Sequence, residues 1–306
     1  MKKIWIVLFL SVSLAVSCSP RTGEDDGKLN VVATIGMIAD VARNIGGDYV
    51  SVTGLMGPGV DPHQYKATAR DLQRLGSADI ILYNGLHLEA KMGEVFEKLE
   101  GRTVTIPVAE SIPVEKLLGE GSATHDPHVW FDVSLWTIVA DEIHAAFSEA
   151  DPENAAEYRA NYTSYRAKLV DLEAEVQEAV AELPEERRVL ITAHDAFGYF
   201  GEAYGFRVMG LQGLSTVSEA GTQNVRKLAD FIADNRIPAI FVESSVPKKN
   251  IEALRAAVNS RGYNVQIGGE LFSDAMGDAG TEEGTYIGMV RHNVHTIVGA
   301  LAGSGE

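Results

Sequence analysis

The stretch DPENAAEYRANYTSYRAKLVDLEAEVQEAVAEL, residues 151–183, decides how this chain is organised. It contains no glycine, and no proline interrupts it between Pro152 and Pro184. Asp151 is suited to cap a helix, and Pro152 is suited to its first turn. Large apolar side chains recur along the stretch at helical spacing. They are Tyr158, Tyr162, Tyr165, Leu169, Leu172, Val176 and Val180. The pattern predicts one uninterrupted helix.

The length of this helix indicates its role. A helix of about 32 residues is about 48 Å long, which exceeds the width of one small domain. We therefore expect a single helix that runs along two halves of the chain and joins them. Because one stiff helix replaces several flexible crossings, the halves should move only by small tilts. A coiled coil is the alternative, but the apolar pattern is too short and too often interrupted by alanine.

Strand-like and helix-like segments alternate on both sides of this helix. Before it the β-rich runs are LNVVATI (29–35), VSVTGL (50–55), ADIILYN (78–84) and RTVTIPV (102–108). After it they are RRVLITAH (187–194), FRVMGL (206–211), PAIFVESS (238–245) and YNVQIGGEL (263–271). Helical patterns fall between them, including 224–235 and 250–260. Nearly continuous apolar runs are typical of strands covered on both faces. The expected fold is α/β with two domains, 29–150 and 184–306, each a mainly parallel sheet flanked by helices, joined by the helix 151–183.

The first 18 residues differ from the rest. Lys2 and Lys3 precede an apolar run of about 13 residues, which is too short to span a membrane and predicts a secretory signal. The signal ends in LAVSC at Cys18, the only cysteine, and resembles a bacterial lipoprotein signal whose cysteine is lipidated. Ala15 stands where leucine or valine is more usual, so simple secretion with cleavage near Ser17 is the alternative. The polar residues 19–28 predict a flexible tether.

The composition excludes some classes of partner. The 306 residues carry a formal net charge of −17. Nucleic-acid binding needs basic patches, so this acidic chain is not expected to bind nucleic acid. The charge fits a soluble extracytoplasmic body that attracts cations.

Three histidines and an aspartate follow or lie between strand signals. Asp-Pro-His occurs twice, at 61–63 and 126–128, and proline stiffens the backbone just before His63 and His128. His194 ends one predicted strand, and Asp274 follows another. Ligands bind outside the carboxyl ends of parallel strands, so these four groups could converge between the domains. Three imidazoles and a carboxylate suit Zn²⁺, or Mn²⁺ or Fe²⁺ if the carboxylate binds through both oxygens. On position alone, ordinary solvated loop histidines remain the favoured reading.

The other histidines have simpler interpretations. His125 could be an accessory metal ligand, but a solvated loop residue is the favoured reading. His87 follows a strand and could line the cleft, although packing or capping is favoured. His292 and His295 lie three residues apart near the end of the chain, without a neighbouring carboxylate, and are expected to be surface or packing residues.

Three acidic residues lie near a candidate ligand in the sequence or follow a predicted strand. Glu243 follows a predicted buried strand and could hold an imidazole from behind, or could bond locally. Asp195 follows His194 directly and is expected to orient the turn. Asp278 is an acidic neighbour of Asp274, and neither Asp195 nor Asp278 is expected to be a ligand.

Five blocks of sequence together resemble one family of proteins. They are GPGVDPHQYKATARDLQRLGSADIILYNGLHLE, HDPHVWFDVSLW, ITAHDAFGYFGEAYGF, IFVESSVPKKNIEAL and GELFSDAMG, and they cover essentially the whole mature chain. The chain resembles the TroA-like (cluster 9, or cluster A-I) zinc and manganese solute-binding lipoproteins of ABC transporters. That resemblance implies two α/β domains joined by one long helix, with the metal between them. It also implies that the metal ligands are His63, His128, His194 and Asp274.

The chain departs from two common patterns of that family. Manganese-binding members often have glutamate where this chain has His194. Many zinc-binding members place a long loop rich in histidine and aspartate before the second ligand, whereas this chain has only GEGSATHD (119–126). Three nitrogen ligands favour Zn²⁺ over Mn²⁺ in the Irving–Williams order. Metal availability and coordination geometry could reverse that preference, so both metals remain candidates for the cargo.

The resemblance implies one function, and the residues leave two alternatives. The expected function is capture of Zn²⁺ or Mn²⁺ outside the cytoplasmic membrane, by a lipid-anchored monomer that delivers the metal to an ABC permease and its ATPase. A zinc hydrolase would need an open water position and a base such as Asp195 or Glu243, but four ligands close the shell and no H-E-x-x-H pattern exists. A metal-stabilised adhesin is the third reading, in which metal removal would unfold the protein.

Overall fold

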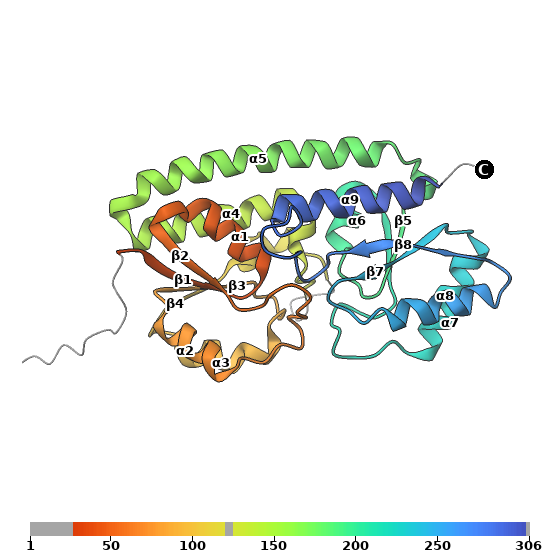
Figure 1. The fold of residues 1–306 in the computed structure, drawn as a ribbon, viewed down its shortest axis with the longest axis horizontal. Coiled ribbons are helices and arrows are strands. Elements are labelled where there is room, and N and C mark those ends of the chain that lie inside the picture. Colours follow the sequence, from red (N-terminus) through yellow and green to blue (C-terminus); the bar gives the residue numbers. More distant parts are fainter. Residues whose placement is uncertain (1–26, 120–124, 304–306) are drawn as a thin grey trace, which may run out of the picture.

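The computed structural model describes residues 27–119 and 125–303, and Figure 1 shows two α/β domains side by side. The predicted signal, Cys18 and most of the predicted tether lie outside the described residues. None of the helices in the described ranges is both long and apolar enough to cross a membrane.

The first domain is built on one parallel sheet with the strand order β2-β1-β3-β4. Its strands are β1 (Leu29–Ala33), β2 (Val50–Gly54), β3 (Ile80–Tyr83) and β4 (Val104–Pro107). Its helices are α1 (Gly36–Gly46), α2 (Ala69–Ser77), α3 (Gly93–Leu99) and α4 (Val133–Ala150). The two central strands are the most buried, as expected for a parallel sheet covered on both faces.

The second domain contains two parallel pairs of strands. They are β5 (Val189–Thr192) with β6 (Arg207–Gly210), and β7 (Ala239–Glu243) with β8 (Gln266–Leu271). The helices are α6 (Gly198–Tyr204), α7 (Thr222–Asp234), α8 (Lys249–Asn259) and α9 (Tyr286–Ala302). Strand β5 lies beside β7 without a continuous hydrogen-bonded ladder. All eight predicted strands are confirmed, but the second sheet is interrupted at its centre.

The predicted long helix is present as α5 (Ala155–Ala181), and it begins later than expected. A 3₁₀ turn, Pro152–Asn154, precedes it. The carboxylate of Asp151 makes no capping bond to the backbone. It accepts hydrogen bonds from the Asn154 amide at 2.8 Å and the Tyr158 hydroxyl at 2.7 Å instead. The side-chain partners therefore replace the N-cap role that was predicted for Asp151.

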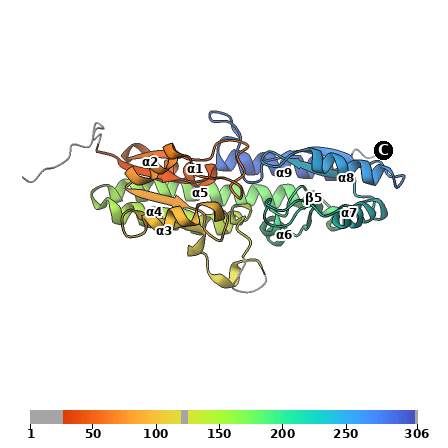
Figure 2. The ribbon, with the colours of Figure 1, turned by 90° about the horizontal axis from the view of Figure 1, so that it is seen from below.

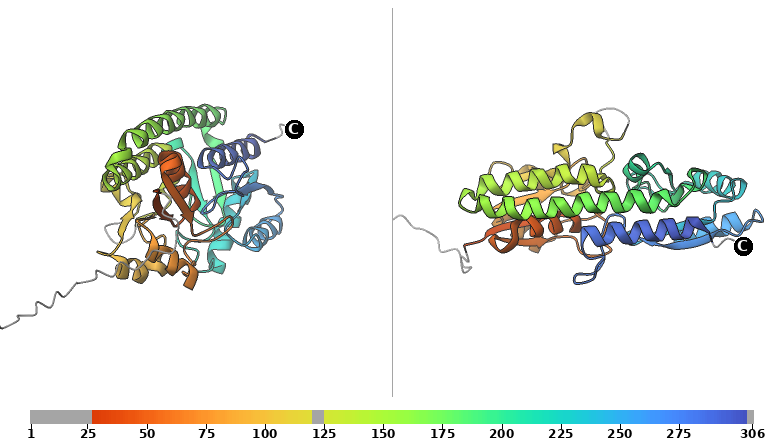
Figure 3. Two further views of the ribbon diagram at one scale, coloured as in Figure 1. Left: turned by 60° about the vertical axis from the view of Figure 1, so that its left-hand side comes forward. Right: turned by 90° about the horizontal axis from the view of Figure 1, so that it is seen from above.

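A second helix also connects the two domains. Figure 3 shows α9 lying beside α5, and the two helices are in contact. At the start of α9, the backbone N–H of Tyr286 donates to Asp40 of α1 at 3.2 Å. The Tyr286 hydroxyl donates to the carbonyl of Trp130 at 2.8 Å. Figure 2 gives the view at right angles, with α5 spanning both domains. Two helices rather than one therefore restrict the relative motion of the domains.

A single hydrophobic cluster extends from the first domain through α5 into α6 and α9. Six of the seven apolar residues that recur at helical spacing along α5 belong to this cluster and form a buried stripe. The seventh, Tyr162, is half-buried against the cluster. The strands and helices at the far side of the second domain form a separate cluster. The main core therefore lies under α5, where the domains join.

Truncation of this stripe should destabilise the whole protein. Leu169 is fully buried, whereas the next residue, Val170, is 56% exposed. We expect Leu169→Ala to lower the free energy of unfolding by about 2–5 kcal/mol, because it leaves a cavity. Val170→Ala should change it by less than about 0.5 kcal/mol. Urea unfolding of the metal-free variants would measure both, and equal midpoints would contradict the assignment of the stripe.

Candidate metal centre

Four loops bring His63, His128, His194 and Asp274 together between the domains. His63 lies in the loop after β2, and His128 immediately precedes a 3₁₀ turn that leads into α4. His194 follows β5, and Asp274 follows β8. Each residue offers one ligand atom, and these atoms all lie within 4.8 Å of one another. The structure thus places the four candidate ligands in one group, two from each domain.

The ligand atoms converge on a common point. The two Nε2 atoms of His63 and His128 are 3.2 Å apart. Asp274 Oδ2 lies 3.2 Å from Nε2 of His194 and 3.7 Å from Nε2 of His63. Asp274 Oδ1 lies 3.5 Å from Nε2 of His128. Four such atoms at close range match the donor set of a tetrahedral metal site.

The centre is buried, and three of its polar atoms lack hydrogen-bond partners in the part of the chain that the structure describes. Exposure of the four residues does not exceed 4%. Within the described residues, His194 Nε2 and both carboxylate oxygens of Asp274 are buried without a hydrogen-bond partner. Buried polar atoms normally have partners, because leaving them unpaired costs about 1–3 kcal/mol each. A bound divalent cation would satisfy these atoms, so the residues fit a metal.

Carboxylates hold two of the three imidazole rings from behind. Asp126 Oδ1 lies 2.7 Å from Nδ1 of His128, and Glu243 Oε2 lies 2.5 Å from Nδ1 of His194. Such a carboxylate fixes the ring tautomer so that Nε2 presents its lone pair to a metal. Of the two interpretations of Glu243, the structure shows the contact with an imidazole ring. The contact of Asp126 was missed, although its place in Asp-Pro-His was a usable signal.

The two Asp-Pro-His copies share a local turn and differ beyond it. In each copy the aspartate Oδ1 accepts a 2.9 Å hydrogen bond from the histidine backbone N–H two residues later. This turn, together with the intervening proline, directs each imidazole into the centre. Only in the second copy does the aspartate also reach the ring.

The charges of the centre shift the pKa values of its members in opposite directions. Burial favours the neutral imidazole of His63 and lowers its pKa to about 4. Burial acts in the same sense on His194, but the carboxylates of Glu243 and Asp274 outweigh it and raise the His194 pKa well above its usual range. Burial opposes ionisation of Asp274, yet the three nearby imidazoles, His194 first, lower its pKa below its usual range. The metal-free centre therefore favours a carboxylate at Asp274 paired with a protonated His194.

The surroundings of His292 and His295 agree with their simpler readings, whereas the exposed side chain of His87 does not bear out the packing role favoured for it. His87 is exposed, and His295 is exposed on α9. His292 donates from Nε2 to the carbonyl of Glu270 at 3.0 Å, and its ring contacts Phe272. The packing and surface roles predicted for the histidines of α9 are therefore confirmed. The expected absence of a neighbouring carboxylate is wrong, because Nδ1 of His292 lies 3.8 Å from Oε1 of Glu283.

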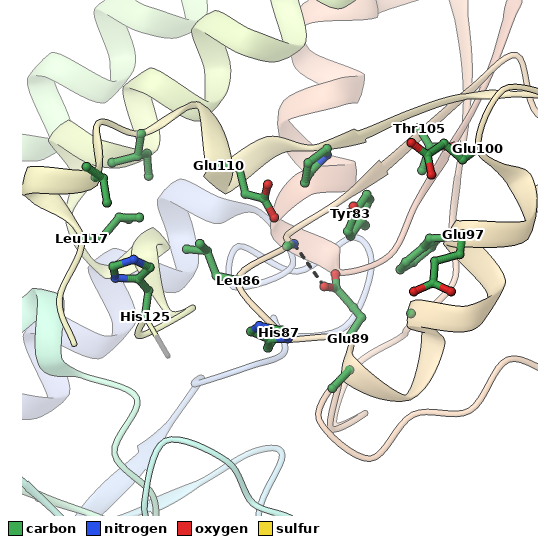
Figure 4. Close-up of a pocket in the computed structure, with 17 residues that line it drawn as sticks. Tyr83, Leu86, His87, Glu89, Glu97, Glu100, Thr105, Glu110, Leu117 and His125 are labelled. Carbon is green, nitrogen blue, oxygen red and sulfur yellow. Dashed lines mark hydrogen bonds between the residues drawn. The ribbon is translucent and has the colours of Figure 1, made fainter. Parts of the chain in front are cut away.

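His125 lies away from the centre, at a separate cavity of about 850 Å³ in the first domain. Glu97, Glu100 and Glu110 also line this cavity. Figure 4 shows His125 and His87 on different segments with Leu86 between them. The cavity provides no convergent set of three ligand atoms within the described ranges. An accessory ligand role for His125 thus gains no support from the geometry.

The two further aspartates do not join the ligand group. Asp195 is half-buried, and burial raises its pKa. Asp278 is exposed. A contact that the sequence did not indicate lies close by: the indole N–H of Trp130 donates to the carbonyl of Ser273, at 3.0 Å. Trp130 thereby joins the His128 loop to the residue that precedes Asp274.

Replacement of Glu243 should weaken metal binding without removing a ligand. We expect Glu243→Gln to lower the affinity for Zn²⁺ by about 10- to 100-fold, because an amide holds the His194 ring less strongly than a carboxylate. Glu252→Gln on the exposed side of α8 is the matched control and should leave the affinity unchanged. Competition with a chromogenic chelator would measure both, and equal affinities for the two variants would contradict this role of Glu243.

Two α/β domains joined by a long helix, with a buried group of three histidines and one aspartate between them, define a metal-binding protein of the solute-binding class. The chain belongs to the ZnuA family, the periplasmic component A of the zinc-uptake complex, whose model matches residues 31–300. The resemblance seen in the sequence is thereby confirmed. The family is an uptake component and not a class of enzyme, which excludes the hydrolase reading.

Individual relatives show how closely the chain follows this family. The zinc-binding protein TroA of Treponema pallidum is 58% identical over 277 residues, which cover 90% of each chain. The manganese-binding lipoprotein MntA of Bacillus subtilis is 50% identical over 298 residues, covering 96% of this chain and 97% of the relative. The solved structure of the periplasmic zinc-binding protein TroA from Treponema pallidum superposes with a TM-score of 0.89, at 58% identity, and covers 90% of this chain and 99% of that one.

Proposed function

We propose that this protein captures a divalent transition metal, Zn²⁺ or Mn²⁺, outside the cytoplasmic membrane and passes it to an ABC importer. His63, His128, His194 and Asp274 would be the ligands. The observation that carries the proposal is the convergence of their four buried ligand atoms within 4.8 Å. Fe²⁺ is a further cargo that this donor set could hold.

The donor set bears on the choice of metal. Three imidazole nitrogens and one carboxylate favour Zn²⁺ over Mn²⁺ on affinity alone. Both carboxylate oxygens of Asp274 are available, so the site could also bind Mn²⁺ through both of them. The names of relatives support either cargo, since one is zinc-binding and another manganese-binding.

The proposal also includes the partners of the protein, its membrane anchor and its functional units. A relative is named as the substrate-binding lipoprotein of a metal ABC transporter, which supports a permease and its ATPase as partners. We propose a lipid anchor at Cys18 that tethers a monomer through residues 19–28. The functional units would be a first domain (29–150), the linking helix (151–183) and a second domain (184–306).

Metal analysis tests this function directly. Protein purified without added metal would be analysed for its metal content, stripped with chelator, and titrated with Zn²⁺ and Mn²⁺ separately and in competition. We expect one tightly bound ion per chain and loss of that binding in His63→Ala. Undiminished metal affinity in both single variants, His63→Ala and Asp274→Ala, would overturn the ligand assignment. Unfolding of the protein on metal removal would instead favour a structural metal, as in the adhesin reading.

A further inference from the structure

His63 is held less directly than the other two histidines of the centre. Carboxylates contact Nδ1 of His128 and of His194. Among the described residues, no side chain donates to or accepts from Nδ1 of His63. Its imidazole therefore depends for its position on the backbone of its own loop.

A residue of the second domain holds that loop. Asp61 accepts the backbone N–H of His63 on Oδ1 at 2.9 Å. Its other oxygen, Oδ2, accepts the hydroxyl of Thr216 at 2.5 Å and the amide of Gln64 at 2.9 Å. Gln64 Nε2 also lies 3.4 Å from the Thr216 hydroxyl. We call the hydrogen bond from Thr216 to Asp61 the Thr216 bridge.

The second domain fixes Thr216 from its own side. Thr216 is only 7% exposed in the segment between β6 and α7. Within that segment Gln212 donates from its side chain to the carbonyl of Ser218 at 2.9 Å. Asn250 of α8 donates to Gln212 at 3.3 Å. Contacts from α8 therefore help to hold the segment that carries Thr216.

We propose that Thr216 is a positioning residue that holds His63 in the metal centre and sets the rate at which the metal leaves. The inference rests on the proposed function. The bridge is a hydrogen bond to a carboxylate, which is stronger than a neutral one. When the domains tilt apart the bridge breaks, and His63, which lacks a carboxylate behind its ring, is the first ligand to leave. His128 and His194 keep their carboxylates and stay in place.

The test compares three threonine variants. Thr216→Val keeps the shape of the side chain and removes the hydroxyl, whereas Thr216→Ser keeps the hydroxyl. Thr222→Val makes the same chemical change on an exposed residue of the same domain. Release of Zn²⁺ into an excess of chromogenic chelator would be followed by stopped flow. We expect release from Thr216→Val to be about tenfold faster. Thr216→Ser and Thr222→Val should match the unchanged protein.

A second measurement uses the metal-free protein. Amide hydrogen exchange of the segment 57–68 should be faster in Thr216→Val than in Thr222→Val, because the loop has lost its contact with the second domain. Asp61→Asn removes the charge from the other side of the bridge. Both substitutions act on the same hydrogen bond. The acceleration of Zn²⁺ release in the double variant Asp61→Asn/Thr216→Val should therefore be smaller than the product of the accelerations in the two single variants.

Different failures point to different errors. Unchanged Zn²⁺ release in Thr216→Val, or equally fast release in Thr216→Ser, would overturn the role of Thr216. Unchanged exchange of segment 57–68 in Thr216→Val would also overturn it, and this measurement needs no metal. Failure of the unchanged protein to bind Zn²⁺ or Mn²⁺ would instead overturn the proposed function.

Discussion

Replacing Asp274 with alanine should lower the affinity of the protein for Zn²⁺ by about a thousandfold, the largest effect that we expect from a single substitution. Asp274 is the one anionic member of the candidate ligand group, and both of its oxygens are buried without a hydrogen-bond partner among the described residues. Without it, three neutral imidazoles would face a divalent cation with no anionic ligand among them. The raised pKa of His194 would also fall, because Asp274 is one of the two carboxylates that raise it.

Two further variants separate the causes of this loss. Asp278→Ala removes an exposed acid four residues away and should leave the affinity unchanged. Asp274→Asn keeps an oxygen in place and removes the charge, so an intermediate loss would show how much of the effect is electrostatic. Competition titrations with a chelator of known affinity would measure all three. A loss of less than tenfold in Asp274→Ala would mean that Asp274 is not a ligand.

Acid should release the metal, with an affinity that falls by about tenfold for each pH unit below the raised pKa of His194. A metal binds neutral imidazole, so any proton on the metal-free centre must leave first. The pKa of His194 is raised well above its usual range, mainly by Glu243 against the opposing effect of burial. Below that raised pKa His194 carries a proton in the metal-free protein, and the metal must displace it. Above the raised pKa the proton is already absent, and the pH dependence should disappear.

His63 changes this profile only in stronger acid. Burial lowers the pKa of His63 to about 4, so this imidazole stays neutral at higher pH. Protonation of His63 should therefore compete with the metal as the pH approaches about 4, where it should steepen the slope. Zn²⁺ affinities measured at constant ionic strength would give the profile. Glu243→Gln should flatten it near neutrality, and an affinity independent of pH in the unchanged protein would contradict the assigned proton.

Much of the fold followed from local patterns in the sequence. The apolar spacing between Tyr158 and Val180 predicted the linking helix and its buried face, and the short apolar runs predicted all eight strands. The details that failed depend on side-chain partners. Asp151 bonds to Asn154 and Tyr158 in place of the backbone, and the helix begins after a 3₁₀ turn. The second connection through α9 was missed, because nothing in its own sequence shows that it packs across both domains.

The candidate centre followed from the sequence to a lesser degree. Position after strand signals nominated His63, His128, His194 and Asp274, but only the family resemblance preferred them over ordinary loop histidines. Their role as ligands remains a proposal. The carboxylates behind the imidazole rings were harder to predict. The sequence allows either a ring contact or a local hydrogen bond for Glu243, and it indicates Asp126 only as part of a stiff tripeptide.

By itself, the sequence determined the α/β alternation, the linking helix and the residue types offered to a metal, because these features depend on spacing along the chain. Tertiary structure alone decided which polar atoms meet. Thr216 and Asp61 are 155 positions apart, and Trp130 and Ser273 are 143 apart. No local pattern relates such residues, since their contacts exist only when α5 and α9 hold the two domains together. The physical reason is that hydrogen-bond partners across a domain boundary are set by packing, whereas helices and strands are set largely by periodicity.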